Sequence, residues 1–92
     1  MQESETWRLA PSAALRPEPF GALAYDFASR RLTFLKTPTL VDVVRSLADH
    51  RTVGAALDAA AVTAEERPAY LRALDRLGAT GLIVHARAGS PP

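Results

Sequence analysis

The feature that most constrains this fold is the stretch 31–47, where the hydrophobic period changes from two to 3.6 within a few residues. Its first half reads RLTFLK, with Leu32 and Phe34 alternating with Thr33 and Leu35. This period of two predicts a strand over residues 32–36.

The second half of the stretch carries the signals of a helix that starts at once. Thr37 suits a helix N-cap and Pro38 suits the first helical position. Apolar side chains then follow at i, i+3, i+4 and i+7, at Leu40, Val43, Val44 and Leu47. The stretch therefore predicts a strand that runs directly into a packed helix over 38–48.

Two further strands are predicted upstream, at residues 13–18 and 22–27. Pro17 and Pro19 cannot donate ladder hydrogen bonds, so the first strand belongs at a sheet edge that is blunted against further pairing. A meander in the order of the chain leaves the third strand at the other edge with unpaired backbone groups. On this expectation, Leu35→Pro removes one of the free edge N–H groups.

The second half of the chain is predicted to be helical. We expect a short helix over residues 53–60. We expect a turn over residues 63–67, despite the capping-box spacing of Thr63 and Glu66. The third helix is then expected to start at Pro68 and to end at Gly78 and Gly81. Residues 82–84 are a small strand or a strap on the core. The predicted fold class is α+β: a three-stranded antiparallel meander followed by three helices, winged-helix-like.

The amino-acid composition excludes several classes of function but does not identify one. The 92 residues suit one domain, and the absence of cysteine excludes disulfides and thiol chemistry. The net charge of +1 argues against binding nucleic acid by charge alone. No apolar run approaches the ~20 residues of a membrane helix, and no signal pattern is visible, so we expect a cytoplasmic protein without membrane contact.

No arrangement of side chains predicts catalysis. His50 and His85 lack a third ligand motif, and the serines and carboxylates lack the partners that catalysis requires, so we expect no enzyme, cofactor or metal. Arg67, Arg72 and Arg76 on the third helix leave a small winged-helix DNA-binding module as the alternative function. A solvated face with local ion pairs is favoured for these arginines because Asp75 interrupts them. The sets Leu32/Phe34 and Leu71/Leu74 are interpreted first as core.

Several motifs carry a resemblance to a known family. The runs FLKTPTLVDVV at 34–44 and LADHRTVGAAL at 47–57 resemble the precursor-peptide recognition elements of ribosomally made, modified peptides, of which the pyrroloquinoline quinone biosynthesis chaperone is a relative. The runs WRLAPSAALRPEPFGALAYDF at 7–27 and PAYLRAL at 68–74 are similar to the mycofactocin-biosynthesis peptide chaperone family. The family often has Asn at the position of Lys36 and Gly at that of His50, so this chain departs from the family at a strand-to-helix corner and at a turn.

The resemblance implies a function and a site. A precursor peptide would pair with the third strand, lie against the third helix, and be presented to a radical S-adenosylmethionine maturase that modifies the Val-Tyr end of the peptide. The chaperone itself would be non-catalytic. The peptide-binding residues implied are Arg31, Leu32, Thr33, Phe34, Leu35, Lys36, Arg67, Tyr70, Leu71 and Leu74.

The expected organisation is a disordered N-terminus over 1–6, a precursor-peptide recognition domain over 7–87 and a flexible tail over 88–92. We expect a monomer or weak dimer. The cations Arg31, Lys36 and Arg67 would favour an acidic peptide and make its binding sensitive to salt.

Overall fold

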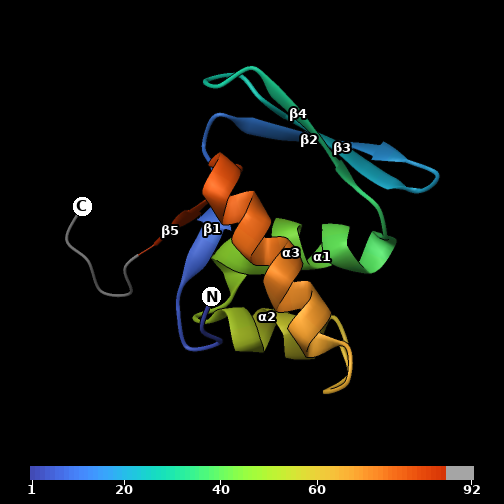
Figure 1. Cartoon of the computed structure of the whole chain (residues 1–92), viewed down its shortest axis with the longest axis vertical. Helices are drawn as coiled ribbons and strands as arrows, with labels where there is room; N and C mark the ends of the chain where they lie inside the picture. Colours follow the sequence, from blue (N-terminus) through green and yellow to red (C-terminus); the bar gives the residue numbers. More distant parts are fainter. Residues whose placement is uncertain (87–92) are drawn as a thin grey trace.

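A computed structural model describes residues 1–86 and shows an α+β fold built on a three-stranded antiparallel sheet. Its strands are β2 (Ala13–Glu18), β3 (Gly21–Asp26) and β4 (Arg31–Leu35), in the order β2-β3-β4. The sheet lies on one side of the molecule, and the helices lie together on the other (Figure 1). The predicted meander and its strand order are confirmed.

The helices follow the sheet in the chain and begin close to their predicted positions. They are α1 (Pro38–Ser46), the 3₁₀ turn η1 (Leu47–Asp49), α2 (Val53–Ala59) and α3 (Arg67–Thr80). The hydroxyl of Thr37 accepts a hydrogen bond from the Leu40 N–H at 3.1 Å, which caps α1 as its sequence predicts. The period change within 31–47 is therefore a strand-to-helix corner in which only Lys36 and Thr37 separate β4 from α1.

The start and the end of α3 both correct details of the prediction. Thr63 and Glu66 do form reciprocal capping-box bonds, with each backbone N–H donating to the other side chain at 3.2 Å. Pro68 lies in the first turn of α3, where its missing N–H costs nothing. Gly78 lies inside the helix and does not end it; Gly81, with φ of 85°, is the C-cap.

A second, two-stranded sheet joins the two ends of the described chain. It pairs β1 (Trp7–Leu9) with β5 (Ile83–His85) in antiparallel register. The apolar run near the end of the chain is thus a strand, while β1 was not predicted as one. A Cβ atom on Gly78 would lie 3.1 Å from the Trp7 ring, so this glycine lets β1 approach α3 closely.

The core lies between the inner face of the three-stranded sheet and the helices. It contains Ala22, Ala24 and Leu35 from the sheet together with the helical residues Val43, Val44, Leu47, Val53, Leu57, Leu74 and Leu77. The expectation that Leu32 and Phe34 belong to the core is wrong, because they are 55% and 57% exposed. Leu32 and Phe34 lie on the outer face of the sheet, since Leu35 of β4 and Ala22 and Ala24 of β3 are fully buried on the inner face.

Residues 1–6, expected to be disordered, have backbone hydrogen bonds with the start of α2 in the structure. The carbonyls of Glu3 and Glu5 each accept a bond at 2.9 Å, from the N–H groups of Gly54 and Val53. The domain boundaries 1–6, 7–87 and 88–92 stay a prediction, and the tail at 88–92 lies outside the described residues together with residue 87.

Candidate functional site

The edge of β4 is the first component of the candidate site. Within residues 1–86, β4 pairs with β3 on one side and with no strand on the other. At the opposite edge, Pro17 lies within β2 and Pro19 follows this strand directly, and neither residue can donate a ladder hydrogen bond to a further strand. The predicted asymmetry of the two edges is confirmed.

The register decides which backbone groups of β4 are free. The Phe27 N–H donates to the Ser12 carbonyl of the segment that leads into β2, so the backbone N–H and C=O groups of Phe27 and of every second residue before it point towards β2. The backbone groups of the intervening residues, Ala22, Ala24 and Asp26, therefore point towards β4. Their partners in β4 are Leu35, Thr33 and Arg31.

The backbone groups of Leu32 and Phe34 therefore point out of the sheet. A second observation agrees, because the Leu35 carbonyl oxygen lies so close to Gly21 of β3 that it would clash with a Cβ atom there. The sequence-based expectation that Leu35→Pro removes a free N–H is thus wrong, since the Leu35 N–H belongs to the ladder with β3 and its side chain is fully buried.

A groove between this edge and α3 is the second component of the site. It has a volume of about 350 Å³, at the lower end of the range for small-ligand pockets. Its lining comes from β4, the corner, α1 and α3: Thr33, Phe34, Leu35, Lys36, Leu40, Ala73, Arg76, Leu77 and Thr80. The groove is thus an apolar trough that runs beside free strand donors and acceptors.

A smaller cavity extends the groove towards the start of α3. It has a volume of about 160 Å³ and shares Leu40 and Ala73 with the larger one. Thr37, Ala69 and Tyr70 complete its lining. Together the two cavities follow α3 over about three turns, which is enough for an extended segment of several residues.

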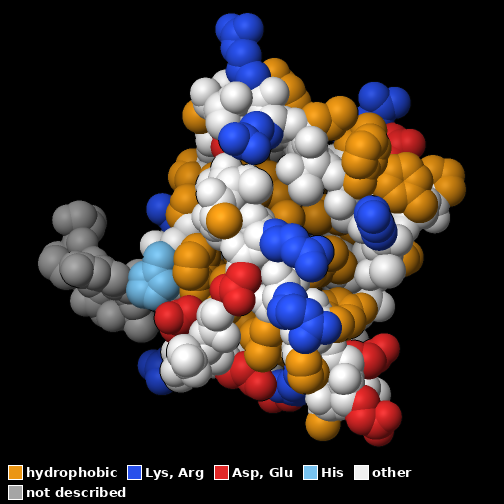
Figure 2. Space-filling view, viewed as in Figure 1, with side chains coloured by type: hydrophobic (Ala, Val, Ile, Leu, Met, Phe, Trp, Pro, Cys, Tyr) orange, Lys and Arg blue, Asp and Glu red, His pale blue; other side chains and the backbone are white. Residues whose placement is uncertain are grey.

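Two cations lie in the groove. Lys36 and Arg76 both contribute to its lining, and neither forms an ion pair with any residue of the described part of the chain. Basic side chains are visible across the face of the molecule that α3 presents to the viewer, with apolar side chains around them (Figure 2). An occupant that combines apolar side chains with a carboxylate would suit this lining.

The structure brings together part of the predicted peptide-binding set. Thr33, Phe34, Leu35 and Lys36 line the groove, and Tyr70 lines its extension. Arg31 and Leu32 lie on β4 but outside both cavities.

The other three predicted residues lie elsewhere. Leu74 is fully buried in the core, and Leu71 is half-buried against it. Arg67 is held in ion pairs with Glu3, at 2.8 Å, and with Asp58. The hydrogen bond with Asp58 and then that with Glu3 raise the pKa of Arg67, so this guanidinium ties the N-terminal segment and α2 to α3.

Sequence reasoning missed most of the α3 side of the groove. The missed residues are Ala69, Ala73, Arg76, Leu77 and Thr80 on α3, together with Thr37 at the corner and Leu40 on α1. Residues 69, 73, 76 and 80 are spaced by four, three and four positions, so they form one helical face beside the buried stripe. That spacing was visible in the sequence, but small and polar residues on a helix face carry no sign that a groove lies above them.

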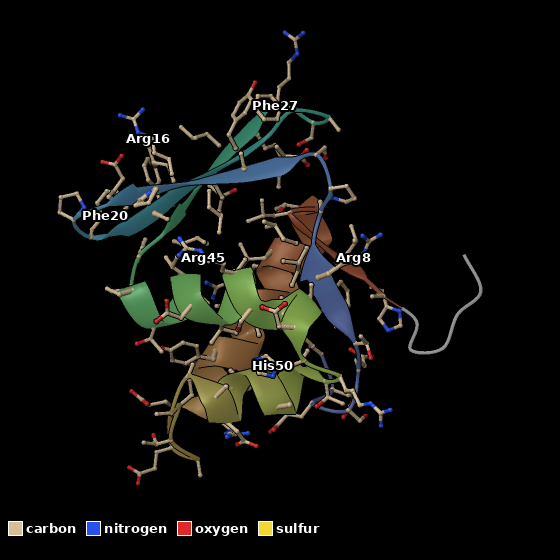
Figure 3. All side chains as sticks on the ribbon, turned by 180° about the vertical axis from the view of Figure 1, so that it is seen from behind. Arg8, Arg16, Phe20, Phe27, Arg45 and His50 are labelled. Carbon is tan, nitrogen blue, oxygen red and sulfur yellow. The ribbon has the colours of Figure 1, made fainter. Side chains whose placement is uncertain are left out.

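A third cavity, of about 340 Å³, lies away from the groove and is lined mainly by α1, η1 and the end of α2. Arg45 and His50, labelled in Figure 3, contribute to it together with Asp42 and Asp49. Within residues 1–86, no group of three or more His, Cys, Asp and Glu residues is arranged to hold a metal ion. In the same range, none of the helices combines the length and the apolar character required to cross a membrane.

Comparisons with known proteins give one consistent result. The model of the peptide chaperone MftB family matches residues 6–84. The chain is 51% identical over 78 residues to the peptide chaperone MftB of Mycobacterium ulcerans, covering 85% of this chain and 72% of the relative. It is 49% identical over 79 residues to that of Mycolicibacterium smegmatis, covering 86% and 78%, and 45% identical over 78 residues to that of Mycobacterium tuberculosis, covering 85% and 72%. No solved structure matches the chain.

Proposed function

Because this chain belongs to the peptide chaperone MftB family, a family of chaperones and not of enzymes, we propose that it binds the precursor peptide of mycofactocin biosynthesis as an added strand on β4. The chaperone then presents the peptide to a radical S-adenosylmethionine maturase in the cytoplasm. The observation that carries this proposal is the open edge of β4 beside the groove against α3.

Strand addition explains how one short edge holds a peptide. An added strand lies about 4.8 Å from β4, which brings it over the groove that β4 and α3 enclose. Main-chain hydrogen bonds to Leu32 and Phe34 supply affinity, and alternate peptide side chains enter the groove and supply selectivity. The bound stretch is held by its backbone, so the remainder of the peptide stays available to the maturase.

The charges of the groove favour an acidic peptide. Lys36 and Arg76 face a groove in which the lining residues carry no carboxylate. A peptide carboxylate placed between them gains an attraction that speeds encounter and weakens as salt rises. Arg67, which the sequence suggested for this role, is already neutralised by Glu3 and Asp58.

An NMR titration of ¹⁵N-labelled protein with the mycofactocin precursor peptide from the same genome, at two salt concentrations, tests the proposal. We expect saturable binding, with shifts at 31–36 and at Ala69, Ala73 and Thr80 on α3, and with weaker affinity at higher salt. Shifts confined to the third cavity around Arg45 and His50, or no saturable binding, would contradict it. A parallel titration with duplex DNA tests the winged-helix alternative, for which shifts would appear at Arg72 and over residues 82–86, outside the groove.

A further inference from the structure

The outer face of the three-stranded sheet carries an apolar patch over β3 and β4, although this face points away from the helices. The register places Phe34 beside Leu23 and Leu32 beside Tyr25 on this face. The exposed side of an antiparallel sheet is ordinarily polar, so packing within this chain does not account for these residues. An exposed apolar patch of this kind marks an interaction site.

Aromatic side chains extend the patch at both ends of the sheet. Phe20, 43% exposed, packs against Phe34 with ring centroids 6.1 Å apart, and Phe27, 64% exposed, packs against Tyr25 at 4.8 Å. Figure 3 shows Phe20 and Phe27 at opposite ends of the sheet, away from the helices. Phe20 therefore supports the β4 part of the patch, whereas Phe27 belongs to the end nearest the β3–β4 turn.

The same two residues of β4 supply both the free backbone groups and the outer-face side chains. Leu32 and Phe34 point their N–H and C=O groups out of the sheet edge and their side chains onto the outer face. In an antiparallel pair, residues directly opposite each other place their side chains on the same face, with Cβ atoms about 4.5–5.5 Å apart. Peptide residues opposite Leu32 and Phe34 must therefore lay their side chains on this patch.

We infer that the outer face of the sheet is a second selectivity surface, on which Leu32 and Phe34 bind apolar side chains at two alternate positions of the peptide. This inference rests on the proposed function, because it requires strand addition to β4. The intervening peptide side chains enter the groove over Leu40 and Leu77. The recognised segment is thus apolar at successive positions beside Leu32, Phe34, Leu40 and Leu77, and carries its carboxylate where it passes Lys36 and Arg76.

The charges around the patch favour the peptide over a second copy of the chain as its occupant. Arg16 lies on the same face beside Leu23, and Arg30 and Arg31 are exposed at the β3–β4 turn. Glu18, the nearby carboxylate, already forms an ion pair with Arg16 at 3.1 Å. Two copies laid face to face would bring these arginines together, whereas an added strand covers only the β4 side of the patch.

The double variant Leu32→Thr, Phe34→Thr tests the inference with the precursor peptide. Threonine keeps strand propensity and the backbone N–H but removes the apolar contacts. Loss of two cross-strand pairs raises the Kd by about two- to thirtyfold. Phe27→Thr is the control, because this exposed ring on the same face packs against Tyr25 of β3 and lies outside the β4 part of the patch that the added strand covers, and we expect its Kd to be unchanged. A change of less than twofold in the double variant, with the fold intact by circular dichroism, would overturn the inference.

Intermolecular NOEs separate this inference from the function on which it rests. We expect NOEs from the Leu32 methyls and the Phe34 ring to peptide side chains at i and i+2, and from Leu40 and Leu77 methyls to the residue at i+1. NOEs to the groove alone would overturn the outer-face inference and leave strand addition standing, while loss of all binding would remove both. If sedimentation shows that the double variant loses a dimer without a change in Kd, the patch belongs to a second copy and the inference is wrong.

Discussion

The orientation of the β4 backbone predicts that proline at position 34 damages peptide binding and not folding. The Phe34 N–H points out of the sheet, so its removal breaks no bond of the β3–β4 ladder. Proline restricts the preceding Thr33 to extended geometry, which that residue already has in β4. Phe34→Ala is the matched comparison, because it removes the same ring and keeps the N–H.

The size of the effect follows from one hydrogen bond. A main-chain bond contributes a net 0.5–1.5 kcal/mol, roughly, so the Kd of Phe34→Pro should exceed that of Phe34→Ala by about two- to thirteenfold. The melting curves of the two variants should be alike. Thr33→Pro provides the opposite control, because its N–H pairs with Ala24, which is fully buried, and leaving that carbonyl unsatisfied costs about 1–3 kcal/mol of stability.

Calorimetric titration with the precursor peptide and thermal unfolding by circular dichroism measure both quantities. If Phe34→Pro and Phe34→Ala bind the peptide equally well, the Phe34 N–H does not hold the peptide and strand addition at this edge is refuted. If Phe34→Pro unfolds the chain while Thr33→Pro does not, the deduced orientation of the backbone is reversed.

Three further predictions follow from the groove, the corner and the turn. Arg76→Gln should raise the peptide Kd by about two- to fivefold at low salt and flatten its salt dependence, with Arg72→Gln, outside the groove, as a neutral control in calorimetric titrations. Gly21→Ala should lower the free energy of unfolding in urea by more than Gly81→Ala does, because a Cβ would collide with a backbone carbonyl at Gly21 and would meet nothing within 4 Å at Gly81. Equal losses in the two variants would contradict this account. Asp26 accepts a hydrogen bond from the Ser12 hydroxyl at 2.6 Å, which lowers the pKa of Asp26 below the ordinary value of 3.8. The contribution of this carboxylate to the free energy of unfolding is therefore complete above pH 3.8 and is lost as the pH falls through the folded pKa, so Asp26→Asn should flatten the acid limb of the pH–stability curve.

Local signals accounted for the elements of the main sheet and the helices. The alternation over β4, the Thr37 cap and Pro38 are all contained within a few residues, so the strand-to-helix corner was predictable. Alternation assigns two faces to a strand but does not say which one meets the helices. Because Leu32 and Phe34 are as apolar as Leu35, the pattern could not show that the first two are exposed.

Contacts between segments that are far apart in the sequence could not be predicted from such local signals. Each strand of the β1–β5 pair has three residues, and the pairing joins positions at the two ends of the described chain. Arg67 likewise is tied to Glu3, which is remote in sequence, so its pattern could not show that this guanidinium is held in an ion pair within the chain. The groove was only half predictable for the same reason, since its α3 wall depends on how β4 and α3 come to face each other.

The pairing of β1 with β5 also decides how this fold responds to force. Trp7 pairs with His85, so the two ends of the described ladder lie side by side at one end of it. Tension applied at those residues opens the ladder one bond at a time, as a zipper opens, and does not shear all of its bonds together. Trp7 then leaves its place against Gly78, so α3, the wall of the groove, loses its contact with β1 before the three-stranded sheet is loaded.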